Sequence, residues 1–174
     1  MKEKSLYNGK LFPEYIYDNN LLSCIFLEFD FIFTEEFWII FRQYLDQNRI
    51  IKITIENIQP KDFPFYDEVY VNDLPQSFID STCERKMQNY INGSASFYML
   101  TENAMIYSKE NKNLFCLFLD RQYDLAILGL SNRNDIDPFN DFIIKDINDY
   151  LTIAFKGNEI PQKFKERLNA NWKL

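Results

Sequence analysis

Hydrophobic residues recur along this chain at two spacings, one typical of strands and one typical of helices. In residues 22–33 the odd positions from Ile25 to Phe33 are apolar, while Glu28 and Asp30 would point to the other face. Similar alternation, or a continuous apolar run typical of strands buried on both faces, marks six further segments. The predicted strands are residues 22–33, 51–56, 65–71, 97–100, 104–107, 114–119 and 125–130.

Apolar side chains three and four residues apart predict four helices. The clearest covers residues 35–47 and follows Thr34, whose side chain is a suitable N-cap. Trp38 and Ile39 lie off the apolar stripe of this helix, so they are either covered by another element or exposed. The other three helices are predicted between Asp73 and Gly93, at residues 138–155 and at residues 161–172.

These elements predict an α+β fold with a mainly antiparallel sheet and packed helices. The short link at residues 120–124 joins the two most apolar strands as an antiparallel hairpin, which we place at the centre of the sheet. Only four glycines and six prolines occur in 174 residues, and no stretch has the composition of a flexible linker. We therefore predict a single domain that spans residues 1–174.

The composition contains no histidine. Histidine is the commonest general acid or base and the commonest metal ligand, so its absence disfavours many reaction classes. Acidic residues outnumber basic ones by 26 to 19, and the net charge of -7 repels nucleic acids and anionic membranes. The same charge favours encounter with a cationic protein. We therefore expect a protein-binding module without enzymatic activity and without a cofactor.

One acidic loop has some features of a calcium-binding loop. Asn132, Asn134, Asp135 and Asp137 offer oxygen ligands at suitable spacing, but the glycine and the closing carboxylate of such loops are absent. A loop that caps the following helix is the simpler interpretation. We therefore predict no metal site here.

A second segment superficially matches the acid and lysine pattern of metal-dependent nucleases. Asp80, Glu84 and Lys86 supply the residue types, but such sites need the side chains to project from one strand face. These three residues fall on the polar side of a predicted helix. A catalytic role is therefore not expected for them.

The three cysteines, Cys24, Cys83 and Cys116, are widely spaced and lie among apolar neighbours. This setting predicts buried free thiols rather than disulfides or nucleophiles. The chain starts without a secretory signal, and its longest apolar region is too short to span a bilayer. We therefore expect a cytoplasmic protein.

The candidate partner-binding residues combine charge with aromatic side chains. Asp135 and Asp137 precede the helix predicted from residue 138, and Asp141 lies one turn into it, so the three carboxylates would converge on a small area. Exposed aromatic side chains supply affinity at many interfaces. Trp38 and Tyr15 are the residues expected in that role.

In these features the chain resembles the immunity proteins of bacterial toxin systems. The resemblance lies in a small acidic α+β chain, rich in asparagine, lysine, isoleucine and phenylalanine, that has no catalytic constellation. It implies a protein that binds one toxin, often a basic nuclease, and blocks it in the cell that makes it. Two alternatives stay open: a secretion chaperone for an effector, and a carboxylate-based metal-dependent hydrolase that uses the region of Asp80 and Glu84 or residues 135–141.

Overall fold

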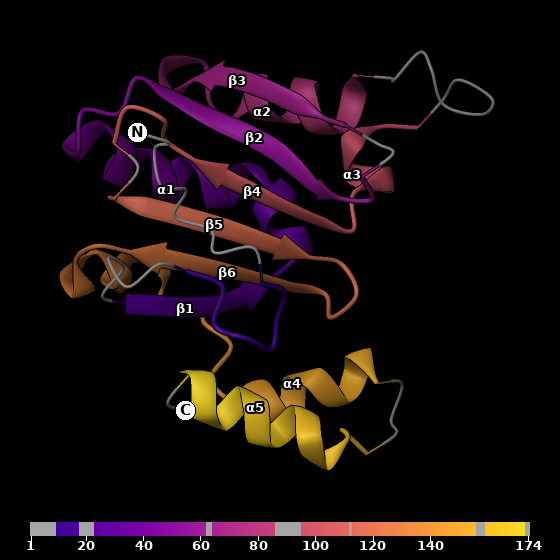
Figure 1. Ribbon diagram of the computed structural model, residues 1–174. Helices are drawn as coiled ribbons and strands as arrows, with labels where there is room; N and C mark the ends of the chain where they lie inside the picture. The colour runs from indigo at the N-terminus through magenta and orange to yellow at the C-terminus, as the bar shows by residue number, and fades with distance from the viewer. Residues whose placement is uncertain are drawn as a thin grey trace, which may run out of the picture.

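A six-stranded sheet runs through the centre of the computed structural model (Figure 1). The structure describes residues 10–17, 23–61, 64–85, 95–111, 113–155 and 159–172. The strands lie in the order β1-β6-β5-β4-β2-β3, and every neighbouring pair is antiparallel. Their bounds are β1 Ser23–Glu28, β2 Lys52–Gln59, β3 Tyr66–Tyr70, β4 Asn103–Tyr107, β5 Phe115–Asp120 and β6 Leu125–Leu130. The predicted α+β class with an antiparallel sheet is confirmed.

Helices pack on both faces of this sheet. One face is covered by α1, α2, α3 and short 3-10 turns, and the other by α4, α5 and residues 11–17 (Figure 1). The α-helices are α1 Glu35–Gln47, α2 Gln76–Ile79, α3 Phe97–Leu100, α4 Ile147–Ala154 and α5 Gln162–Trp172. The shorter helical turns are η1 Asp30–Phe33, η2 Val71–Asp73, η3 Asp80–Glu84 and η4 Arg133–Phe139. Among the described residues, no helix has both the length and the apolar character needed to cross a membrane.

The two faces of the sheet carry two separate hydrophobic cores. Successive side chains of a strand point to opposite faces, so Leu117 belongs to the core under α1 while Phe118 belongs to the core under α4 and α5. Every residue of β5 and β6 is buried. The two strands form the predicted antiparallel hairpin and are both interior, but the central pair of the sheet is β5 and β4, and β6 lies between β5 and the edge strand β1.

Helix α1 begins and ends where the periodicity predicts. The Phe37 N–H donates to Thr34 Oγ1 at 3.3 Å, which confirms Thr34 as the N-cap. Trp38 is wholly buried, because α2 covers this side of α1 and places Phe78 against the indole at a ring separation of 4.3 Å. Ile39, the next residue, is 56% exposed.

The first predicted strand is too long. β1 ends at Glu28, and the chain then turns into η1, so the apolar residues after it no longer follow the strand. Phe31 instead stacks on Phe142, and Phe33 contacts Phe78 and Tyr98. The alternation in residues 22–33 therefore reflects packing against distant rings as well as strand geometry.

Three other elements also differ from prediction. Residues 97–100 form the short helix α3 rather than a strand, because a four-residue alternation cannot distinguish the two. Residues 138–155 are not one helix: Pro138 lies inside η4, and α4 begins only after Asp146. The helix predicted between Asp73 and Gly93 is seen as α2 and η3 as far as Glu84, and residues 86–94 lie outside the described part of the chain.

Candidate functional site

The three predicted carboxylates do not share one site. Asp135 and Asp137 lie in η4 and border a hollow of about 230 Å³ beside the C-terminal half of α1. Asp141 follows η4 and borders a different hollow, of about 530 Å³, beside β1. The structure therefore distributes the three residues between two hollows, because η4 ends at Phe139 and the chain turns before α4 begins.

The two predicted aromatic anchors are also placed differently from expectation. Trp38 is wholly buried and donates its indole N–H to the carbonyl oxygen of Ile32 at 2.9 Å, so it cannot contact a partner. Tyr15 is half-buried and packs against Trp172 at a ring separation of 5.0 Å. Burial, and secondarily Cys24, raises the pKa of Tyr15 to about 12.

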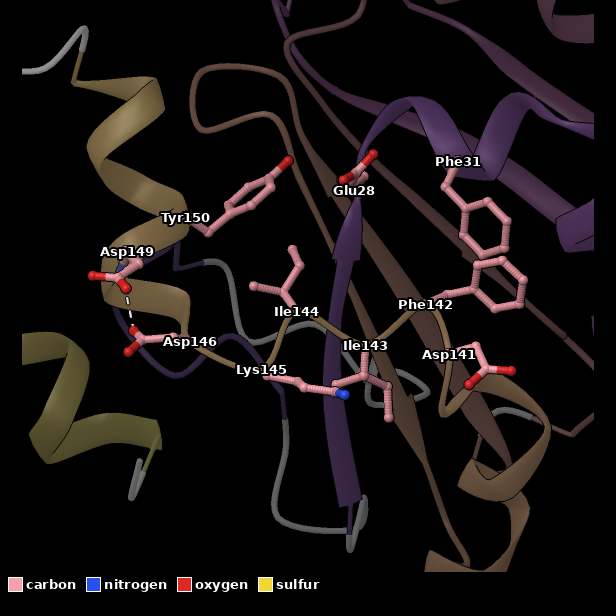
Figure 2. A pocket seen from close by; sticks show the side chains of 10 residues that line it. All are labelled: Glu28, Phe31, Asp141, Phe142, Ile143, Ile144, Lys145, Asp146, Asp149 and Tyr150. Carbon is pink, nitrogen blue, oxygen red and sulfur yellow. Dashed lines mark hydrogen bonds between the residues drawn. The ribbon is translucent and has the colours of Figure 1, made fainter.

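The hollow beside β1 is here called the acidic hollow. Among the hollows described, it is lined by the most charged residues. Figure 2 shows Phe31 and Phe142 at one side, α4 at the other, and the end of β1 between them. One basic residue, Lys145, is among the ten that line it. Four exposed carboxylates line it as well: Glu28, Asp141, Asp146 and Asp149.

Local contacts hold residues 141–146 against the edge of β1. The Ile144 N–H donates to the carbonyl oxygen of Phe26 at 2.9 Å, which extends the hydrogen bonding of the sheet by one bond. Phe142 stacks on Phe31 with ring centroids 4.4 Å apart and an interplanar angle of 16°. These contacts fix the backbone that carries Asp141 at one end of the acidic hollow.

The start of α4 positions two more carboxylates. Asp146 Oδ1 accepts hydrogen bonds from the N–H groups of Asn148 at 2.9 Å and Asp149 at 3.0 Å, so Asp146 caps the helix (Figure 2). Asp149 lies in the first turn, where the helix dipole favours negative charge. The start of α4 therefore holds both side chains at the margin of the acidic hollow.

The electrostatic potential around Asp124 and Tyr150 is negative. Tyr150, which lines the hollow, donates its hydroxyl hydrogen to the carbonyl oxygen of Asp124 at 2.7 Å. Burial raises the pKa of the Asp124 carboxyl, and the nearby carboxylates of Asp30 and Glu28 raise it further. Burial, Asp124 and Glu28 likewise raise the pKa of Tyr150. The side chains of Asp124 and Tyr150 therefore both lie within the influence of the negative charges of Glu28 and Asp30.

The acidic hollow combines charged groups with apolar surface. Its polar groups lie at the margin, and Phe142, Ile143 and Ile144 supply apolar surface between them. Such a surface can hold the aliphatic stem of a lysine or arginine while carboxylates receive the charged end. Within the described residues, no group of three or more histidine, cysteine, aspartate or glutamate side chains is placed to hold a metal ion.

The segments that resembled catalytic motifs occupy ordinary structural positions. Asn132 caps η4 by accepting a hydrogen bond from the Asn134 N–H at 3.1 Å, so Asp135 and Asp137 lie within this 3-10 helix rather than in a loop before an α-helix. Asp80 and Glu84 begin and end the single helical turn η3 rather than sharing a strand face. Lys86 lies outside the described residues.

All three cysteines are free thiols, as predicted, but only one is buried. Cys116 has no exposed surface, whereas Cys24 and Cys83 are half-buried. Burial raises the pKa of all three thiols, to about 11 for Cys24. The setting of each cysteine therefore disfavours the reactive thiolate form.

Two exposed aromatic residues were missed by the sequence reasoning. Tyr66 and Tyr70 are each 50% exposed on the edge strand β3, at the opposite side of the sheet from the acidic hollow. Lys109 lies over the Tyr66 ring and Lys52 over the Tyr70 ring, both at 4.6 Å. The alternation of Tyr66, Glu68 and Tyr70 along one strand face was the signal that could have identified them.

The chain was compared with models of protein families, with curated proteins and with solved structures. None of these comparisons gave a match. The resemblance to immunity proteins therefore rests on general sequence features.

Proposed function

We propose that this protein binds a cationic protein through the acidic hollow, and that it acts as an immunity protein that neutralises a toxin. The observation that supports binding is the gathering of Glu28, Asp141, Asp146 and Asp149 around a hollow of about 530 Å³ with one lysine. The proposed toxin carries a basic surface that faces these carboxylates. The binding protein itself performs no reaction.

The exposed carboxylates act mainly on the rate of association. Their charges reach about 8 Å into solution at physiological ionic strength before salt screens them. Complementary charge of this kind raises the rate at which two proteins meet, while buried apolar contacts determine how long they stay together. Phe142 and Ile143 lie within the acidic hollow and are half-buried, so they can supply such contacts.

A growth assay tests the immunity function. Each open reading frame that flanks the gene is expressed alone in a bacterial host, and any that arrests growth is expressed again together with this chain. We expect one of them to be toxic and its toxicity to be relieved. A secretion chaperone would bind a neighbouring product without relieving toxicity, and the absence of any toxic neighbour would contradict the proposal.

A pair of charge-matched variants then tests the binding site. Asp141→Asn with Asp149→Asn removes two charges from the acidic hollow, and Asp135→Asn with Asp137→Asn removes two charges outside it. With the toxin immobilised for surface plasmon resonance, the double variant at Asp141 and Asp149 is expected to lower the association rate severalfold at low salt. The second pair should have a smaller effect, and high salt should abolish the difference. Equal effects of the two pairs would show that only net charge matters.

A further inference from the structure

A third hollow, here called the Asp120 hollow, lies at the end of the hairpin formed by β5 and β6. It has a volume of about 320 Å³. Asp120 is the last residue of β5 and lines this hollow, yet only 2% of its surface is exposed. Among the described residues, no lysine or arginine forms an ion pair with its carboxylate. A buried carboxylate without a cationic partner is costly unless a proton or a ligand neutralises it.

The walls of the Asp120 hollow are of two kinds. Leu11, Phe12 and Tyr123 provide apolar surface, and the rings of Phe12 and Tyr123 meet edge to face with centroids 5.5 Å apart. The polar side contains Glu102 and Asn103 at the start of β4. A cavity with aromatic walls and a carboxylate suits a cation on an alkyl chain.

The neighbouring arginine, Arg121, does not neutralise the Asp120 carboxylate. Arg121 lies at the border of the Asp120 hollow, but the Nε–H donates to the carbonyl oxygen of Thr101 at 3.0 Å. The guanidinium also bonds the carbonyl oxygen of Tyr98, and its central carbon lies 4.5 Å from the centroid of the Phe29 ring. Arg121 is thus engaged with Phe29 and Tyr98 of the core under α1, whereas Phe12 and Tyr123 of the Asp120 hollow belong to the core under α4 and α5.

We propose that the Asp120 hollow binds an alkylammonium group, with the Asp120 carboxylate as its counter-ion and the ring of Tyr123 against its alkyl chain. In the complex with the toxin this group is a lysine side chain. That second statement rests on the proposed function, whereas the first concerns the Asp120 hollow alone.

Binding of the cation displaces a proton. Burial raises the pKa of Asp120 to about 7, and the carboxylate of Glu102 adds to this, while hydrogen bonds from the N–H groups of Tyr123 and Gln122 and from the Asn103 side chain oppose it. In the empty hollow the carboxyl group is therefore partly protonated near neutral pH. When the ammonium group enters, the proton leaves to the buffer and the carboxylate pairs with the cation.

The structural alternative is that Asp120 only orders the hairpin turn. The Tyr123 N–H donates to Asp120 Oδ1 at 3.4 Å, as in many turns that contain aspartate. Asp120→Asn retains this acceptor but cannot carry a negative charge. The variant therefore separates the role in the turn from the role as a counter-ion.

The test uses n-butylammonium as the probe, n-butanol as its neutral analogue, and isothermal titration calorimetry. We expect the wild-type chain to bind butylammonium above about pH 7, and to bind it about tenfold more weakly for each pH unit below that value. Asp120→Asn should weaken binding by about tenfold or more and abolish proton release. Glu36→Gln, an exposed carboxylate of α1, is the control and should change nothing.

Two results would overturn the proposal: butylammonium that fails to bind the wild-type chain at about pH 8, or binding that Asp120→Asn leaves unchanged. If Asp120→Asn does not fold, the carboxyl carbon of Asp120 is followed by NMR in the wild-type chain, where butylammonium and not butanol should lower its pKa. The probe contains no toxin, so this result is independent of the proposed function. Binding of butylammonium together with unchanged toxin neutralisation by Asp120→Asn would refute only the assignment to a toxin lysine.

Discussion

Replacement of Asp120 by asparagine is expected to make the protein more stable, by an amount that grows with pH. The wild-type carboxyl group has an ordinary pKa of 3.8 and a pKa of about 7 in the folded protein. Between these values the folded state binds the proton that the unfolded state has released. The free energy of unfolding therefore falls as the pH rises from about 4 to about 7, and levels off above that. Asparagine carries no charge in either state, so the free energy of unfolding of the variant does not fall for this reason.

The magnitude follows from the two pKa values. One pKa unit corresponds to about 1.36 kcal/mol, so the change from 3.8 to about 7 destabilises the wild-type chain by roughly 4 kcal/mol once the pH exceeds both values. At about pH 5 the same difference in pKa destabilises the wild-type chain by only roughly 1.5 kcal/mol. The advantage of Asp120→Asn should therefore rise from about 1.5 to about 4 kcal/mol between pH 5 and pH 9.

Urea denaturation followed by tryptophan fluorescence measures this difference at several pH values. Asp46→Asn is a suitable control, because it removes a carboxylate that forms an exposed ion pair with Arg42. Such a pair contributes only a few tenths of a kcal/mol, so this variant should differ little from wild type. A difference between Asp120→Asn and wild type that stays constant with pH would show that Asp120 titrates normally in the folded protein.

Three further predictions concern packing and capping. Phe118→Ala removes a ring that is wholly buried under α4 and α5, and should lower the free energy of unfolding in urea by about 3 to 5 kcal/mol; a loss below about 1 kcal/mol would contradict the packing. Thr34→Ala should cost about 1 kcal/mol in the same assay, while Thr34→Ser should retain the cap of α1. Cys116 should react with a thiol reagent only after unfolding, and Cys83 should react in the folded protein, as mass spectrometry of labelled peptides can show.

Helix α1 and the hairpin of β5 and β6 could be predicted because their signals are local. The cap at Thr34 and the apolar spacing after it specify the limits of the 13-residue helix α1 from its own sequence. β5 and β6 are apolar at nearly every position, which is possible only for strands covered on both faces. In these segments the local sequence pattern and the tertiary packing favour the same secondary structure.

The acidic hollow could be predicted only in part. Asp141 was identified from the sequence, but it lies with Glu28 from β1 and Asp149 from α4 rather than with Asp135 and Asp137. Glu28 and Asp149 are separated by more than a hundred residues. Their proximity depends on one backbone hydrogen bond beside β1 and on the break that ends η4, neither of which has a periodic signal.

The sequence by itself determined the fold class, the interior strands and the negative charge. Secondary structure follows from the spacing of nearby side chains, and net charge is a sum over residues. Only the tertiary structure decided which of the aromatic and acidic residues face solvent. Trp38 is buried because α2, contributed by a later part of the chain, places Phe78 over it. Asp120 is buried because β4 and residues 11–17 close around the end of β5, and burial in a protein depends on such distant neighbours rather than on the residue itself.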